Sequence, residues 1–175
     1  METTTALTLA IPSEFQDNIN TIRKLYDRAY PRWMPHINFI FPFVAEDKFD
    51  DIIERLSPKL KEFGSFELEI NQIGHFKQGK NITVHIKPND SSRLKELFNL
   101  INKTIPDVEV KHSEFAPHLT IAQFKSSESE PKIKELTEWI ATNKFKFTVD
   151  HICILQRSKT DNNVPFSIHS KIQLN

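Results

Sequence analysis

Cysteine and glycine are scarce in this sequence. Among 175 residues there are one cysteine, Cys153, and three glycines. A single cysteine excludes a disulfide framework and a cysteine-rich zinc site. The few glycines, with 10 prolines and 26% charged residues, exclude collagen-like and low-complexity chains. We therefore expect a folded chain that buries a hydrophobic core without disulfide or metal staples.

Long hydrophobic runs and an excess of one charge are also lacking. No segment approaches the roughly 18 apolar residues of a membrane span. The N-terminal METTTALTLAIPSEF has no basic start and no cleavage site of small residues, so it does not predict a signal peptide. We expect a cytoplasmic or nuclear protein that does not contact membranes.

The balance of charge limits the nucleic acid that this chain could bind. Lys and Arg number 23, and Asp and Glu also number 23. A groove for a long duplex would need many phosphate contacts and therefore net basic charge. We expect a small or terminal substrate instead, and a monomeric protein.

The hydrophobic periodicity alternates between strand and helix along the whole chain. Helical stripes are predicted from Ser13 to before Pro31, from Asp47 to Gly64, from Ser91 to Pro106, and after Pro131. The order of elements predicts an α+β fold whose two halves look alike, in a single domain over residues 1–175. The predicted strands are residues 6–11, 36–44, 66–76, 81–87, 118–124, 145–157 and 166–174.

Several local signals refine these boundaries. Ser13 and Gln16 fit a capping box at the first helix. Gly64 suits the C-terminal cap of the second helix, and Pro58 predicts a kink or break within it. The KQGK sequence at 77–80 predicts a hairpin turn.

Two similar motifs occur once in each half. Residues 35–43 are PHINFIFPF and residues 117–124 are PHLTIAQF. Both read proline, histidine, aliphatic, polar, and the matched positions share one constant offset. Such an internal repeat indicates two copies of one structural unit. The matched pairs are Pro35 and Pro117, His36 and His118, and Asn38 and Thr120.

The alternation of a strand gives this repeat a chemical meaning. Residues two apart share one face of a strand, so His36 projects with Asn38, and His118 with Thr120. Two such strands could bring two imidazoles and two hydrogen-bonding side chains around one point. Opening a cyclic phosphate requires a base for water and an acid for the leaving alkoxide, and histidine suits both near pH 7. Neither motif contains a carboxylate, and no metal is required.

The doubled motif resembles the signature of the two-histidine phosphoesterase superfamily, which includes 2'-5' RNA ligase-like proteins and cyclic phosphodiesterases. The resemblance implies a bilobal, pseudo-symmetric α+β fold: two antiparallel sheets flanked by helices, with a central groove. It implies that His36 and His118 are catalytic, and that Asn38 and Thr120 bind phosphate without a cofactor. It further implies that His118 is the base and His36 the acid in hydrolysis.

The sequence departs from the family pattern at two positions. Asn38 stands where Thr or Ser is usual, and Gln123 stands where Arg is frequent, which leaves the substrate open. Further candidates for substrate contacts are Tyr30, Arg32, Trp33 and Gln123, because aromatic and basic side chains can stack on bases or meet phosphates. We expect structural roles for four of the remaining histidines, His75, His85, His151 and His169. For His112, six residues before the second motif, a structural role and an approach to the substrate both stay open.

Three functions remain open at this stage. The first is a metal-independent phosphoesterase acting on a 2',3'-cyclic phosphate or a 2'-5' phosphodiester of RNA ends or nucleotides. The substrate could be a tRNA end, 2'-5' oligoadenylate, an ADP-ribose cyclic phosphate or an oligouridine tail. The second is a non-catalytic protein that binds RNA ends or nucleotides in the same groove. The third is a metal-dependent hydrolase with histidine ligands, which usually also recruits carboxylates.

Overall fold

The structure of the chain is a computed structural model that describes residues 1–112 and 114–175. Strands and helices alternate along the chain largely as the periodicity predicts. The strands are β1 (Thr5–Ala10), β2 (His36–Ile40), β3 (Phe66–Gln78), β4 (Asn81–Pro88), β5 (Leu119–Lys125), β6 (Phe145–Val149), β7 (His151–Gln156) and β8 (Ser167–Gln173). The helices are α1 (Ser13–Tyr26), α2 (Phe49–Phe63), α3 (Ser92–Thr104) and α4 (Ser129–Thr142), with 3-10 turns at Glu46–Lys48 and Ser126–Glu128.

The described strands form two four-stranded antiparallel sheets. One sheet has the order β2-β1-β7-β8 and the other the order β5-β4-β3-β6. Each sheet therefore draws two strands from each half of the sequence. The two strands that carry the repeated motifs, β2 and β5, lie at corresponding edges of the two sheets.

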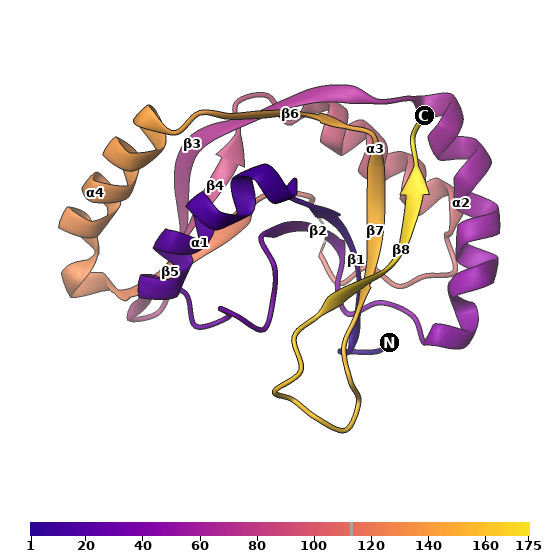
Figure 1. Cartoon of the computed structure of the whole chain (residues 1–175), viewed down its shortest axis with the longest axis horizontal. Helices are drawn as coiled ribbons and strands as arrows, with labels where there is room; N and C mark the ends of the chain where they lie inside the picture. The colour runs from indigo at the N-terminus through magenta and orange to yellow at the C-terminus, as the bar shows by residue number, and fades with distance from the viewer. Residues whose placement is uncertain (113) are drawn as a thin grey trace.

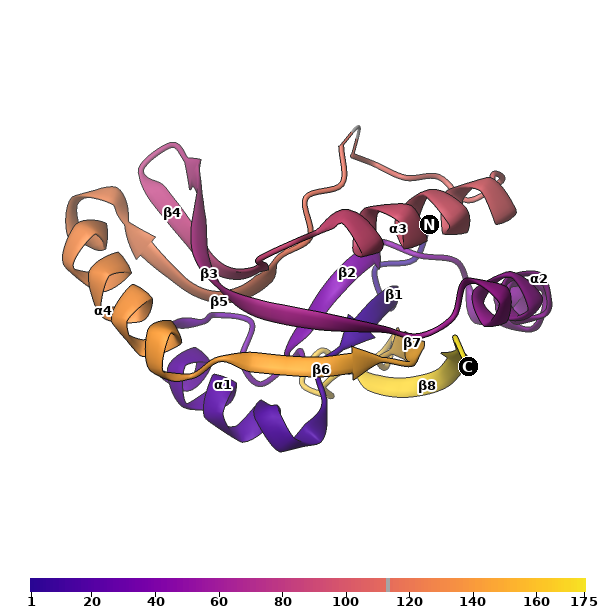
Figure 2. The ribbon, with the colours of Figure 1, turned by 90° about the horizontal axis from the view of Figure 1, so that it is seen from above.

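Two long extended segments run through the fold, and the second of them joins the two sheets (Figures 1 and 2). The first part of β3 pairs with β6, with Leu68 opposite Phe147, and the rest of β3 pairs with β4. The segment 145–157, predicted as one strand, is instead two strands separated at Asp150. After Asp150 the chain leaves the second sheet and pairs with β1 in the first, so one extended run serves both sheets.

The helices gather at the two ends of the molecule. Figure 2 shows α1 and α4 at one end and α2 and α3 at the other. The first pair packs on the second sheet, with α1 against β5 and α4 against β3. At the other end α2 packs against both β8 and α3. No described helix has the length and hydropathy needed to cross a bilayer.

Some local predictions are confirmed and others are wrong. Gly64 caps α2 with φ of 79°, a conformation that suits glycine, but α2 runs through Pro58 without a break. The expected capping box is not formed at α1, because Pro12 precedes the helix as its N-cap and the Ser13 hydroxyl makes no capping bond. The Gln16 side chain instead donates to the Ile11 carbonyl at 2.9 Å.

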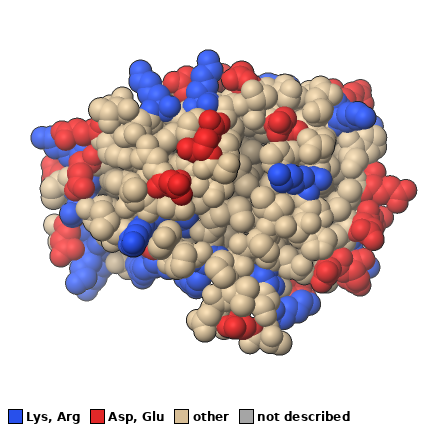
Figure 3. All heavy atoms as spheres, viewed as in Figure 1, with Lys and Arg blue, Asp and Glu red and all other residues tan. Residues whose placement is uncertain are grey.

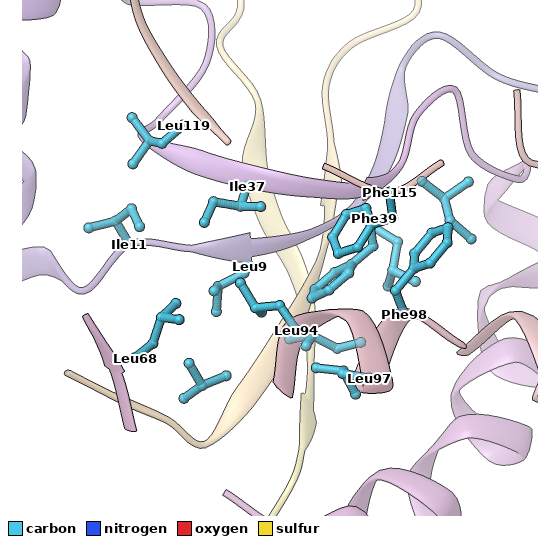
Figure 4. Close-up of a cluster of buried hydrophobic side chains, with 14 of the residues drawn as sticks. Leu9, Ile11, Ile37, Phe39, Leu68, Leu94, Leu97, Phe98, Phe115 and Leu119 are labelled. Atoms are coloured by element: carbon cyan, nitrogen blue, oxygen red, sulfur yellow. The ribbon is translucent and has the colours of Figure 1, made fainter. Parts of the chain in front are cut away.

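One hydrophobic cluster connects the two sheets and the helices (Figure 4). It contains Ile37 and Phe39 from the first motif and Leu119 from the second, all fully buried. In Figure 4 these side chains lie with Leu9 of β1 and Leu94 of α3. The apolar residues of both motifs thus hold β2 and β5 against the core, which leaves the alternate residues free for the opposite face.

Candidate active site

The two motifs occupy equivalent places in the fold. Residues of β2 and β5, the edge strands of the two sheets, approach one another in space. In both motifs the proline and the aliphatic residues are buried, while the histidine and the polar residue two positions later are partly exposed. The alternation predicted from the sequence is therefore present in both strands.

A hollow of about 370 Å³ lies between the motifs. Asn38 of β2 and His118, which immediately precedes β5, both line it. The other two predicted site residues, His36 and Thr120, do not line it; each lies two positions from a lining residue, on the same face of its strand. Two aromatic rings at the hollow are more than a third exposed, Phe41 at 37% and Phe76 at 39%.

Both imidazoles are held by the same hydrogen bond. His36 Nδ1 lies 2.6 Å from the Met34 carbonyl oxygen, and His118 Nδ1 lies 2.8 Å from the Ala116 carbonyl oxygen. A carbonyl oxygen can only accept, so Nδ1 must carry the proton in each ring. Nε2 is then the atom that gains or loses a proton in each histidine. This is the tautomer that an acid–base pair needs, with Nε2 free for the substrate.

His36 is packed against an aromatic wall. The Trp33 ring is stacked on it with centroids 4.5 Å apart, and Phe166 is stacked on Trp33 at 3.7 Å. Burial is the main reason why the pKa of His36 is lowered from 6.5 to about 4, with the hydrogen bond to the Met34 carbonyl opposing it in part. His36 is consequently neutral at pH 7 in the free protein.

A buried polar network links the two motif strands behind His36. Arg23 Nε donates to Asp27 Oδ2 at 2.9 Å, and Arg23 also donates to the Trp33 carbonyl at 2.8 Å. Gln123 of β5 donates from Nε2 to Asp27 Oδ1 at 3.0 Å, and its Oε1 accepts from the Arg28 backbone N–H at 2.8 Å. Both ends of the Gln123 amide are therefore used within the protein. Gln123 acts here as a bridge from the second motif to the segment that supports His36.

A third histidine stands beside His118. His85 of β4 is 5% exposed, and its ring centroid lies 5.3 Å from that of His118. Phe76 stacks on it at 4.5 Å, and Gly74 of β3 is its partner across the strands. A Cβ on Gly74 would lie 2.5 Å from His85 Nε2, so glycine is needed for the ring to lie there. Burial lowers the pKa of His85 to about 4, and nearby positive groups add to this effect.

Two buried oxygen atoms at the first motif have no protein partner among the described residues. They are Asn38 Oδ1 and Thr8 Oγ1, and their residues are paired across β1 and β2. Buried polar atoms are normally satisfied, so unsatisfied ones often mark a place where a ligand or water binds. With Oδ1 buried, the Nδ2 amide is the donor that Asn38 can offer to the hollow.

The other predicted substrate contacts lie outside this hollow. Tyr30 has the Arg23 guanidinium above its ring at 5.9 Å, and exposed Arg32 donates to the Arg28 carbonyl at 3.1 Å. Trp33 contacts protein rings, as described above. Sequence reasoning missed Phe76 and His85, which only the pairing of distant strands brings near the site, and Phe41, which lies within the first motif. His112, which precedes the second motif, also lines the hollow. No three His, Cys, Asp or Glu side chains in the described ranges are grouped so as to hold a metal ion.

Both signs of charge occur over the surface seen in Figure 3. Asp and Glu gather at its right edge and Lys and Arg at its lower left, and uncharged residues cover much of the middle. No broad basic surface for a duplex is visible on this side, as the balanced composition predicts.

Comparison with known proteins gives consistent matches. Residues 11–161 match the sequence profile of the 2'-5' RNA ligase superfamily. A Staphylococcus haemolyticus protein named "Putative phosphoesterase SH1944" is 37% identical over 120 residues, covering 67% of this chain and 70% of its own. A similarly named Staphylococcus aureus protein is 35% identical over the same shares.

Solved structures show the same fold at low identity. Escherichia coli LigT in complex with 3'-AMP superposes with a TM-score of 0.67 at 12% identity, covering 99% of this chain and 98% of LigT. TT0787 of Thermus thermophilus gives a TM-score of 0.65 at 12% identity, covering 98% and 97%. The bilobal α+β fold with two antiparallel sheets, expected from the repeated motif, is confirmed.

Proposed function

Because the chain belongs to the 2'-5' RNA ligase superfamily, we propose that it is a metal-independent phosphoesterase acting on a 2',3'-cyclic phosphate of a nucleotide or RNA end. One observation carries this proposal. Two histidines from matched motifs are the same tautomer, each with Nδ1 bonded to a backbone carbonyl, and the hollow between the motifs is lined by Asn38 of the first and His118 of the second. A 2'-5' phosphodiester offers the same chemistry and is the second substrate to test.

The reaction needs one proton removed and one supplied. A base takes a proton from water as the new P–O bond forms, and an acid protonates the ribose oxygen as its bond to phosphorus breaks. Asn38 and the Thr120 hydroxyl can donate to the non-bridging oxygens, where negative charge increases. After each turnover the two histidines exchange protons with solvent and recover their starting states.

The surroundings of His36 favour it as the base. Its pKa of about 4 keeps it neutral at pH 7, and a neutral imidazole can accept a proton but cannot donate one from Nε2. The acid role then falls to His118. This is the reverse of the assignment that the resemblance implies.

The pH dependence of kcat/KM separates the two assignments, since it reports groups of the free enzyme. If His36 is the base, kcat/KM falls as the pH is lowered through about 4, and this acidic limb is absent in His36→Gln. If His36 is the acid, kcat/KM instead falls as the pH rises above about 4. A loss with rising pH from about 4 that is absent in His36→Gln would therefore reject our assignment.

The proposed function itself is tested by hydrolysis of adenosine 2',3'-cyclic phosphate in EDTA. The wild-type protein is expected to turn over, and His36→Ala and His118→Ala should each lower kcat by about 10²–10⁴-fold. His151→Ala is a matched control, because this partly exposed histidine bonds to Asp150 Oδ1 and lies outside the hollow. Full activity in both site variants would reject the two-histidine mechanism.

The alternative function is a non-catalytic protein that binds nucleotides or RNA ends. Gln123 is the observation that favours this alternative. Its amide is bonded within the protein, so this position supplies no positive charge beside a bound phosphate. That protein would bind adenosine 3'-phosphate in calorimetry, more weakly after His118→Ala, and would hydrolyse neither substrate.

A further inference from the structure

A second hollow adjoins the candidate active site. It has a volume of about 270 Å³ and shares Phe76 and Ala116 with the hollow of Asn38 and His118. Pro117, the neighbour of His118, also lines it. A ligand bound at His118 therefore has a second cavity beside it, on the side of β3, β4 and the start of α3.

The lining of the second hollow is basic. It includes His75 of β3, His85 and Lys87 of β4, and Lys95 of α3, and no carboxylate is among the described lining residues. Lys87 and Lys95 are exposed, and within the described ranges neither forms an ion pair. Two unneutralised ammonium groups facing one cavity favour an anionic ligand.

Two further features of this hollow fit an anion. Ser91, the N-cap of the 13-residue helix α3, lines it, and its side chain makes no capping bond. The start of α3 therefore lies at this hollow, and its first N–H, that of Ser92, is already bonded to Asp90 Oδ1. Beneath them lies His85, 5% exposed, whose Nδ1 has no partner among the described residues.

We propose that this hollow, the lysine pocket (His75, His85, Lys87, Ser91 and Lys95), binds a second phosphate, carried on the 5' oxygen of the nucleoside whose cyclic phosphate lies at His36 and His118. The inference rests on the proposed function. In a 2',3'-cyclic nucleotide the 2' and 3' oxygens are both in the ring, so a further phosphate can only be on the 5' oxygen. The exposed ring of Phe76 lies at both hollows and offers a surface to the sugar or base between the two phosphates.

Three substrates test this assignment: adenosine 2',3'-cyclic phosphate, its 5'-phosphorylated form, and the dinucleotide ApA ending in a 2',3'-cyclic phosphate. The wild-type protein should prefer the last two by on the order of tenfold in kcat/KM, about 1.4 kcal/mol, since charge-assisted phosphate contacts are gained. In the double variant Lys87→Gln/Lys95→Gln, the ratio of kcat/KM between the substrates with and without a 5'-phosphate should fall towards one. If only the dinucleotide is preferred, the group bound in the lysine pocket is an internucleotide phosphate. If both 5'-phosphorylated substrates are preferred, the pocket binds a terminal 5'-phosphate as well.

Lys103→Gln is the matched control for this experiment. Lys103 is an exposed lysine in the last turn of the same helix as Lys95, away from the lysine pocket. This variant should keep the wild-type preference for the 5'-phosphorylated substrates. An equal loss in Lys103→Gln would assign the preference to general surface charge and overturn the proposal.

A binding measurement separates this inference from the proposed function. Adenosine 3',5'-bisphosphate and adenosine 3'-phosphate need no turnover, and calorimetry gives the affinity of each. We expect the bisphosphate to bind more tightly, by a margin that the double variant removes. If the bisphosphate binds more tightly and no substrate is hydrolysed, the lysine pocket is supported and the proposed hydrolysis is rejected. Equal affinities in the wild-type protein, with hydrolysis intact, would reject the lysine pocket alone.

Discussion

His36 and His118 make the same backbone hydrogen bond but have different neighbours. His36 lies under Trp33, with the Arg23–Asp27 pair behind it. His118 has Phe76 and His85 at its edge, with ring centroids 5.1 Å and 5.3 Å away. The repeat thus sets two matching imidazole orientations, and the residues around each motif make the two sites chemically unequal. Unequal surroundings of this kind fit the proposed division of the two histidines into a base and an acid.

The largest expected effect comes from the charge pair that supports His36. In Asp27→Asn the Arg23 guanidinium, 2% exposed, loses its only buried counter-charge among the described contacts. Breaking a buried pair typically costs about 3–5 kcal/mol, so the free energy of unfolding in urea should fall by this amount.

An exposed pair provides the control for Asp27→Asn. Arg93 and Glu96 of α3 form an ion pair whose side chains are 42% and 57% exposed. Glu96→Gln should cost less than about 1 kcal/mol, as surface pairs do. Equal losses in the two variants would show that the Arg23–Asp27 pair is not a special support of the first motif.

The next largest effect concerns the pKa of His36. In Trp33→Leu the imidazole loses its stacked indole and becomes more hydrated, so its pKa should rise from about 4 towards 6.5. NMR titration of the imidazole measures this shift directly. A pKa that stays near 4 would mean that Trp33 is not what desolvates His36.

The same pKa gives a pH dependence of stability. Because the native pKa of about 4 lies below the 6.5 of the unfolded chain, the unfolded state binds more protons between these values. The contribution of His36 is therefore complete above pH 6.5 and is lost as the pH falls through 4. His85 contributes in the same direction, so the slope from pH 6.5 to 4 should decrease in His36→Gln and decrease again when His85→Gln is added.

A smaller change should affect the second motif alone. In Gly74→Ala the new methyl group would collide with the His85 ring, which must shift towards or away from His118. Overpacking of this kind costs about 1–3 kcal/mol, and turnover should fall while the pKa of His36 is unchanged. Gly79→Ala is the control: a Cβ there meets nothing within 4 Å, so it should leave turnover intact despite the φ of 61°.

The smallest expected effect is on the bridge between the motifs. Gln123→Ala removes two hydrogen bonds, to Asp27 and from the Arg28 backbone, at a cost of about 0.5–1.5 kcal/mol each. The bond from Arg28 is exposed and the bond to Asp27 is partly buried, so water can replace them in part. The free energy of unfolding in urea and kcat/KM should therefore fall less than in Asp27→Asn. An equal loss in the two variants would mean that Gln123 supports the site as strongly as the Arg23–Asp27 pair does.

The motif strands could be predicted because their information is local. Alternation alone places His36 with Asn38 and His118 with Thr120, and the burial of Ile37 and Leu119 follows from the same pattern. The surroundings could not be predicted in this way. His85 of β4 lies near the site because its partner on the adjacent strand β3 is Gly74, which leaves room for the ring. The periodicity of one segment does not predict which residues of two strands are paired.

The boundary at Asp150 was missed for a related reason. Residues 145–149 and 151–156 are both apolar and extended, so the periodicity indicates one strand. What divides them is the separation of the two sheets, which depends on where β1 and β3 lie. The Ser13 capping box failed because proline already occupies the N-cap position, and its fixed φ sets the start of the helix.

The passage of one extended segment from the second sheet into the first has a consequence for how the chain can be divided. A fragment ending after β4 would lack the β7 partner of β1, and the complementary fragment would lack the β3 partner of β6. Neither fragment could complete a sheet, although each carries one histidine motif. Mixing the two fragments should restore folded protein, whereas each alone should remain largely unfolded. The repeat therefore describes two halves that are similar in sequence but cannot be separated as folding units.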